Sequence, residues 1–410
     1  MTSRRGALLL VAPLLLALLI GFVAPIGAFL WRAIADDEVS AVLPRSIDAL
    51  RDWDGGPIPD AAFITLAEDL REARLRDAAT GAGGIARAAA RLNAEHPGLR
   101  SLLPATSRRV AAEPRGQVAA EPRGQGANEG DDKASILAAG EDWSTPGPWR
   151  AIRRAGGPVT DYRLLASLDL QRDAAGSIVQ TPGEAAIWRG ILARTLWISA
   201  SATILCLILG YPLAWLIALA PERLQPWLLG GVLLPFWTSL IVRTAAWMVL
   251  LQKEGIVNAA LRGAGLVDQP LPLLMNRFAV LVAMVHILLP FMVLPILAVV
   301  REIDWRLPRA AASLGAGGLR IFLRVLLPLS LPGVGAGCLL VFVQALGFYV
   351  TPALLGGPHD QMLSWFIGFY ANRTVDWGMA ASLSLLLLAA VATVIGVYGR
   401  LVGFDKVRTT

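Results

Sequence analysis

The sequence predicts an all-α membrane protein with six transmembrane helices and a large extracytoplasmic insertion after the first of them. Of its 410 residues, 55% are hydrophobic and 17% are charged, whereas about 25% of a typical soluble domain is charged. Mean hydropathy is +0.56. Span-length apolar runs recur along the chain, and one long polar stretch without such a run interrupts them. Together these observations favour a helical bundle in lipid.

The first apolar run, 6–31, follows Arg4 and Arg5, which are expected to hold the N-terminus in the cytoplasm. A cleaved signal peptide is the alternative, because Ala33-Ile34-Ala35 resembles a cleavage site. The apolar region of a signal peptide has only about 7–15 residues, so residues 1–31 are interpreted as a cytoplasmic N-terminus and a first span. Five further spans are expected at 187–220, 224–251, 278–300, 326–350 and 377–402. Kinks or breaks are expected in these helices at Pro212, Pro235, Pro290, Pro295 and Pro332.

Residues 32–184 form the polar stretch and are interpreted as a partly helical insertion. Phe63, Leu66 and Leu70 recur at helical spacing within 61–102, which predicts an amphipathic helical hairpin broken near 81–84. The stretch 107–133 contains the tandem repeat VAAEPRGQ and few large apolar residues, which predicts disorder. A binding repeat is the alternative, but two copies are fewer than a solenoid requires.

The distribution of basic residues supports this threading through the membrane. With the N-terminus inside, the insertion lies outside, and the loop 301–325 and the tail 403–410 lie inside. The inside segments carry the larger set of cations: Arg4, Arg5, Arg223, Arg301, Arg306, Arg309, Arg320, Arg324, Arg400, Lys406 and Arg408. The short outside loops carry Lys253, Arg262, Arg277 and Arg373. The bias agrees with the positive-inside rule.

Several chemistries have no sequence signal. The chain lacks the GxxxxGK[ST], GxSxG and HExxH patterns. His286 has no second ligand at metal-binding spacing, Cys206 and Cys338 lie in apolar runs, and the net charge of +6 is spread through loops. We therefore expect no catalytic residues, no metal, no cofactor and no nucleic acid, and a transport subunit whose energy comes from a partner.

The stretch 309–337 interrupts the membrane pattern with a short basic segment. It contains Arg309, Arg320 and Arg324, and its glycines at 315, 317 and 318 give the backbone freedom. A connection of this kind is longer than an ordinary loop between spans, so we expect a partner on the cytoplasmic side to dock on it.

Residues of this stretch resemble the EAA loop in the permease subunits of bacterial binding-protein-dependent ABC importers. The matching positions are Ala310, Ala311, Gly315, Phe322, Leu327 and Pro328. Arg309 stands where the family usually has Glu. The segments LLPFWTSLIVRTAAWMVLLQKEGIVN, HILLPFMVLPI and LPGVGAGCLLVFVQALGFYVTPALLGG are similar to the spermidine/putrescine branch of this family. The resemblance covers 187 to the C-terminus and the first span, and leaves out the insertion.

The resemblance implies a MetI-like permease of six helices, with a five-helix core at 187–402, in the bacterial inner membrane. A second permease subunit, cytoplasmic ATP-binding subunits and a periplasmic solute-binding protein would complete the importer, which would move a polyamine by alternating access. The positions implied for contact with the ATPase are Arg309, Ala310, Ala311, Gly315, Ala316, Phe322 and Pro328. Gly315→Asp is expected to abolish transport while the protein stays in the membrane.

Polar and aromatic residues within or near the spans are candidates for the translocation path: Trp237, Arg243, Trp247, His286, Tyr349 and Trp365. Aromatic faces attract a cationic solute. Snorkelling or a structural partner is the alternative for Arg194, Arg243 and His286, because an unpaired charge in hydrocarbon is costly.

Three other functions stay open from the residues alone. One is an importer permease for another small solute, such as an amino-acid derivative. Another is a membrane-anchored sensor or assembly protein that uses the insertion for recognition. The third is a secondary transporter, for which intramembrane ion ligands and inverted repeats would be the signal.

Overall fold

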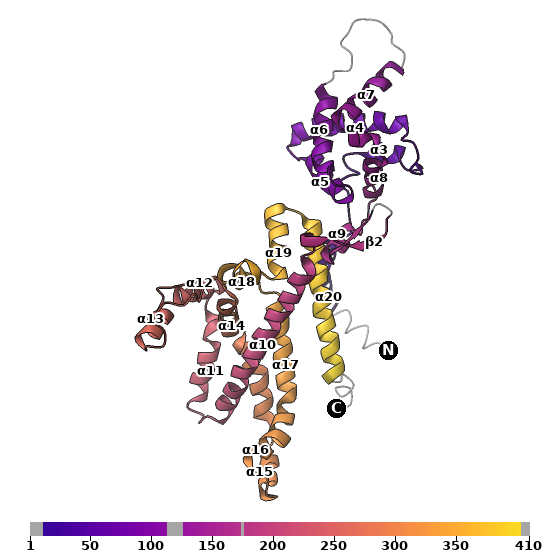
Figure 1. Cartoon of the computed structure of the whole chain (residues 1–410). Helices are drawn as coiled ribbons and strands as arrows, with labels where there is room; N and C mark the ends of the chain where they lie inside the picture. The colour runs from indigo at the N-terminus through magenta and orange to yellow at the C-terminus, as the bar shows by residue number, and fades with distance from the viewer. Residues whose placement is uncertain (1–10, 113–125, 174–175, 403–410) are drawn as a thin grey trace, which may run out of the picture. The chain divides into compact units, whose positions relative to one another are not determined.

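The computed structural model describes residues 11–112, 126–173 and 176–402 (Figure 1). The chain divides into two compact units, Met1–Pro182 and Gly183–Thr410, and each has a hydrophobic core of its own. The predicted all-α class is confirmed. Within the described residues the one sheet is a two-stranded antiparallel hairpin of β1 (Leu170–Arg172) and β2 (Ile178–Gln180).

The first unit begins with a helix, Val11–Trp31, that is long and apolar enough to cross a membrane. This helix includes the π-helical turn η1 (Leu19–Val23) and α2 (Ala24–Trp31). The helices of the insertion follow in the order α3 (Pro44–Ala49), α4 (Asp60–Thr80), α5 (Gly84–Glu95), α6 (Leu99–Ala112), α7 (Gly126–Ala139), η2 (Glu141–Ser144), α8 (Pro146–Ala155) and α9 (Tyr162–Ser167).

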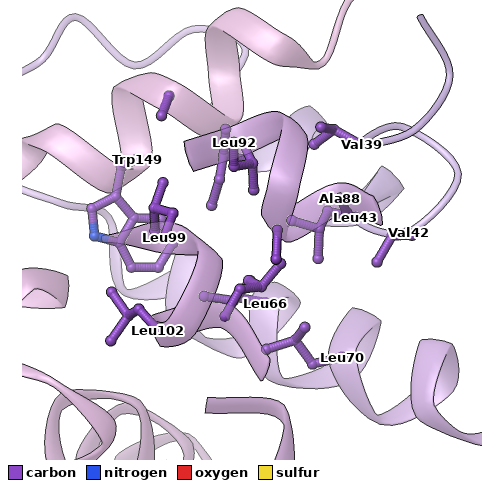
Figure 2. Close-up of a cluster of buried hydrophobic side chains, with 14 of the residues drawn as sticks. Val39, Val42, Leu43, Leu66, Leu70, Ala88, Leu92, Leu99, Leu102 and Trp149 are labelled. Carbon is purple, nitrogen blue, oxygen red and sulfur yellow. The ribbon is translucent and has the colours of Figure 1, made fainter. Parts of the chain in front are cut away.

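The insertion is organised around the apolar face of α4. Leu66 and Leu70 on this face are fully buried against residues of α5 and α6 such as Leu92 and Leu99 (Figure 2). Truncation of such a residue to Ala typically costs about 2–5 kcal/mol. The predicted helical hairpin is confirmed, because α4 ends at Thr80 and α5 begins at Gly84. Gly81 caps the end of α4, with a φ of +66° in the left-handed region.

The prediction of disorder over 107–133 is wrong at both ends of that stretch. Helix α6 continues to Ala112, and α7 begins at Gly126. Val110 is fully buried, and Arg71 of α4 pairs with Asp132 of α7. These tertiary contacts stabilise helical ends that composition alone does not favour. Most of the VAAEPRGQ repeat, 113–125, lies outside the described residues.

A buried ion-pair cluster holds the two connections of the insertion together. Arg91 of α5 pairs with Asp36 at 2.5 Å, with side chains 2% and 0% exposed, and also pairs with Glu95. Arg91 also donates to the hydroxyl of Thr160, and Ala35 bridges to Val159 in an antiparallel pair. Although burial lowers it, the pKa of Arg91 is raised above its ordinary value by the carboxylates of Asp36 and Glu95.

The second unit holds the remaining helices. They are η3 (Gly183–Ala185), α10 (Trp188–Leu219), α11 (Gln225–Leu233), η4 (Leu234–Trp237), α12 (Leu240–Leu251), α13 (Ile256–Gly263), α14 (Arg277–Glu302), α15 (Arg306–Ser313), α16 (Gly318–Ile321), η5 (Phe322–Leu326), α17 (Leu327–Leu346), α18 (Val350–Leu355), η6 (Pro358–Asp360), α19 (Leu363–Phe369), η7 (Tyr370–Thr374) and α20 (Trp377–Val402).

Helices α10, α14 and α17 lie side by side and form the centre of this unit (Figure 1). Small residues allow their close approach. A Cβ added at Gly210 of α10 would lie 2.9 Å from Met292 Cγ, and one at Gly333 of α17 would lie 2.9 Å from the carbonyl oxygen of Pro295. A larger side chain at either position would separate α14 from its neighbours.

Among residues 11–112, 126–173 and 176–402, five helices are long and apolar enough to cross a membrane, or up to six spans if one bent pair of helices counts as a single span. The span expected at 224–251 is interrupted near Pro235, as predicted, because the helix axis turns by 100° between 237 and 240. Pro235 cannot donate to the helical ladder, and Thr238 and Ser239 are extended. Arg243 of α12 donates from Nε to Thr238 Oγ1 at 3.1 Å and from Nη2 to the Thr238 carbonyl at 2.7 Å, which satisfies the backbone at the break.

Candidate functional site

The segment between α14 and α17 consists of two short helical arms. Helix α15 forms the first arm, and α16 with the π-helix η5 forms the second arm, which runs directly into α17. Figure 1 shows this segment at the end of the unit where α14 and α17 are joined. We call residues 304–328 the coupling segment.

Gly315 makes the turn between the two arms. Its φ of +83° lies in the left-handed region that favours glycine. Its N–H donates to the Ala312 carbonyl at 2.9 Å, and the N–H of Ala316 donates to the Ala311 carbonyl at 3.1 Å. This pair of bonds is a Schellman motif, which closes the last turn of a helix. The matched positions Ala311, Gly315 and Ala316 therefore act as one backbone turn.

The π-helix η5 precedes Pro328 for a physical reason. Since proline has no N–H, the carbonyl of Arg324 loses its helical donor four residues ahead. The ladder widens locally, and the N–H of Leu327 bonds to the carbonyl of Phe322, five residues back. Short π-helical turns of this kind are frequent at functional sites.

The outer surface of the coupling segment is apolar and basic. Leu314 is 90% exposed and Leu319 is 74% exposed. An open pocket of about 620 Å³ lies beside them and includes Arg320 and Arg324 in its lining. Arg309 is also exposed, and none of these three arginines has an ion-pair partner among residues 11–112, 126–173 and 176–402. The surface offers apolar contact and unpaired positive charge.

The structure gathers most of the predicted coupling residues on this segment. Arg309 and Ala310 are exposed on α15, and Ala311, Gly315 and Ala316 form the turn. Pro328 is at the start of α17, and Phe322, which begins η5, is half-buried. Phe322 packs its ring edge-on against Tyr211 of α10, with centroids 6.1 Å apart, so its role lies in packing rather than on the exposed face.

The predicted path residues fall into three groups. Trp247 of α12 donates from Nε1 to Nδ1 of His286 on α14 at 3.1 Å, so those two residues are joined. Tyr349 packs over Gly368 of α19, and Trp365 lies on the same helix one turn earlier. Trp237 is separate from both groups at the end of η4, with 86% exposure.

Two arginines of the membrane helices, Arg194 and Arg243, have local partners. Arg243 caps the helix break, and Arg194 of α10 donates to the carbonyl of Gln361 at 3.3 Å. No Asp or Glu occurs in α10, α11, α12, α17 or α20. Within the described ranges no group of three His, Cys, Asp or Glu side chains is placed to hold a metal ion.

Sequence reasoning missed three aromatic residues that join the coupling segment to α10. Trp305 precedes α15 and packs edge-on against Trp215, with centroids 6.2 Å apart. Tyr211 lies one turn before Trp215 and contacts it at 6.3 Å. Two aromatic residues at a spacing of four in an apolar helix resemble ordinary core packing, so only the position of Trp305 next to the basic segment could have signalled them.

Long apolar helices packed around α14, with an exposed basic segment between α14 and α17, are typical of a multi-pass membrane protein. No family model matches the chain. Curated relatives do. The spermidine/putrescine transport system permease protein PotB of Salmonella typhimurium is 35% identical over 210 residues, which are 51% of this chain and 73% of the relative.

Two further relatives widen the comparison. The inner membrane ABC transporter permease protein YdcU of Escherichia coli is 32% identical over 236 residues, 52% of this chain and 72% of the relative. The molybdenum transport system permease protein ModB of Mycobacterium bovis is 31% identical over 198 residues, 48% of this chain and 73% of the relative. The chain belongs to the family of bacterial ABC transporter permeases and is a permease subunit of an importer.

Proposed function

We propose that this permease passes a polyamine across the inner membrane, with the energy supplied by ATP-binding subunits that dock on the coupling segment. A second permease subunit and an external solute-binding protein complete the proposed assembly. The main support for the proposal is the exposed apolar and basic surface of the coupling segment. Leu314 and Leu319 are exposed apolar side chains beside exposed arginines, and the turn at Gly315 lies between the two leucines.

In this proposal both termini and the coupling segment lie in the cytoplasm, and residues 32–184 lie outside. The arginines of the coupling segment support this orientation because basic residues are retained on the inside. Arg309, in place of the usual Glu, implies that the facing surface of the ATP-binding subunit carries carboxylates. Attraction between Arg309 and these carboxylates favours docking, whereas an ATP-binding subunit with a basic docking groove would be repelled.

Aromatic side chains support a cationic solute. Tyr349 is 45% exposed, and it lies next to α19, where Trp365 stacks on Phe369 with centroids 5.3 Å apart. The relatives whose names mention spermidine and putrescine point the same way. The experiment is uptake of radiolabelled putrescine by membrane vesicles with and without ATP, with the subunits that co-purify identified by mass spectrometry. Uptake without ATP by the isolated chain would refute the proposal.

An importer permease for an anionic or zwitterionic solute is the second candidate. Arg194 and Arg243 lie in membrane helices, and no carboxylate accompanies them in α10 or α12. A relative named for molybdenum transport belongs to the same family. Competition of putrescine uptake by an excess of molybdate or of an amino acid distinguishes the two candidates.

We expect Tyr349→Leu and Trp365→Leu each to lower putrescine uptake at low concentration. A cation–π contact contributes about 0.5–2 kcal/mol, which corresponds to roughly a 2- to 30-fold weaker interaction. The matched control is Trp227→Leu, because Trp227 on α11 is 81% exposed and lies apart from both residues in the sequence. If uptake by both variants keeps the concentration dependence of the unmodified protein, Tyr349 and Trp365 do not bind the solute.

A further inference from the structure

Both ends of the coupling segment contact one short stretch of α10. Trp305 precedes the first arm and packs on Trp215, whereas Phe322 begins the π-helix of the second arm and packs on Tyr211. The ring centroids are 6.2 and 6.1 Å apart, and the interplanar angles are 84° and 76°. These are edge-to-face contacts within the favoured range of about 4.5–7 Å.

A hydrogen bond extends the same cluster to α17. Tyr211 Oη lies 3.0 Å from Ser330 Oγ, and Ser330 Oγ donates to the Leu327 carbonyl at 2.9 Å. Either hydroxyl can be the donor in the bond between the two side chains. Tyr211 is therefore fixed to α17 at its hydroxyl and to the coupling segment at its ring.

The backbone around this cluster can bend. Pro212 follows Tyr211 inside α10 and removes one bond of the helical ladder. On the other side, η5 is π-helical between Phe322 and Leu326, and Pro332 lies two residues after Ser330. Kinks in helices occur at prolines and at π-helical turns. A displacement of the coupling segment therefore reaches α10 and α17 at points where each helix can change its direction.

We infer that Tyr211 and Trp215 are the positioning residues that transmit movement of the coupling segment to α10 and α17. This inference rests on the proposed docking of an ATP-binding subunit and adds the route by which docking is linked to the membrane helices. Coupling between sites requires a continuous physical connection with evidence of energetic coupling. The aromatic contacts of Tyr211 and Trp215 supply the physical connection. The energetic coupling is measured by the number of solute molecules transported per ATP hydrolysed.

Trp215→Leu is the informative variant. The indole N–H of Trp215 is buried without an acceptor in the described part of the chain, so removal of the ring leaves no polar group unsatisfied. The quantity to measure is the amount of radiolabelled putrescine transported per ATP hydrolysed, in proteoliposomes that contain the complete transporter. We expect this ratio to fall by at least about fivefold, the lower end of typical coupling between sites, while the ATP-binding subunit still co-purifies.

Two further variants separate transmission from folding. Trp215→Phe keeps an aromatic ring and is expected to recover most of the ratio, and Tyr211→Phe, which removes only the hydroxyl bonded to Ser330, is expected to lower it partly. The matched control is Trp197→Leu, because Trp197 is on the same helix with 65% exposure. Its ratio is expected to stay unchanged.

The outcomes distinguish a failure of the proposed function from a failure of the inference about Tyr211 and Trp215. Failure of the unmodified transporter to take up putrescine with ATP contradicts the proposed function. An unmodified transporter that works, together with an unchanged ratio in Trp215→Leu, overturns the inference alone. Loss of the ATP-binding subunit from Trp215→Leu would also overturn it, because the residue would then support docking and not transmission.

Discussion

Gly315→Asp is expected to reduce ATP-dependent uptake by more than about tenfold, equivalent to more than about 1.4 kcal/mol, at an unchanged level of protein in the membrane. Apart from its two chain neighbours, no residue in the described part of the chain has an atom within 4 Å of a Cβ at this position, so the side chain meets no steric obstacle there. The left-handed φ of +83° strains the backbone, but the turn lies on an exposed segment. The main effect therefore falls on the surface that meets the partner.

Gly315→Asn is the matched control for this variant. Asn has nearly the same shape as Asp and tolerates the left-handed region, but it carries no charge. If the facing groove is acidic, Asn retains more uptake than Asp. Equal loss in both variants assigns the effect to close approach or backbone geometry, and normal uptake by Gly315→Asp contradicts docking at this turn.

Arg91→Met is expected to destabilise the insertion by about 3–5 kcal/mol, because it leaves the buried carboxylate of Asp36 without its cation. The loss also removes the contact of Arg91 with Thr160, which joins α5 to the segment that leaves the insertion. Hydrogen exchange of the full chain, followed by mass spectrometry, measures the effect as faster exchange in α5 and α6.

Two controls accompany this measurement. Arg51→Met removes an ion pair with Asp48 whose side chains are 74% and 68% exposed, and exposed pairs contribute little to stability. The double variant Arg91→Met/Asp36→Leu replaces both buried charges with apolar groups and is expected to recover part of the protection. Slow exchange in α5 of Arg91→Met would contradict a stabilising role for the cluster.

The spans could be predicted because an apolar run of sufficient length has few alternatives. Pro235 predicts an interruption of its span, but the turn of 100° could not be predicted, since many membrane helices tolerate proline. The partner that makes the break stable is Arg243, which folds back on Thr238. A contact between residues five apart across a bend has no periodic signal in the sequence.

The coupling segment could be predicted from Gly315, Pro328 and the arginines, and the structure gives the glycine and the proline a physical role. The glycine supplies the left-handed turn, and the proline accounts for η5. The aromatic cluster with Trp215 depends on tertiary proximity, because Trp305 and Trp215 are far apart in the sequence. The helical ends of 107–133 depend on contacts such as Arg71 with Asp132, which composition does not record.

The most direct test of the account is photo-crosslinking from the exposed tip of the coupling segment. A benzophenone amino acid at Leu314 is introduced into the full chain in the membrane, with the same group at Leu75, an exposed residue of the insertion, as the control. A covalent adduct is expected between position 314 and an ATP-binding subunit, and no such adduct is expected from position 75. ATP-dependent uptake with no such adduct at position 314 would contradict docking of the ATP-binding subunit on this segment.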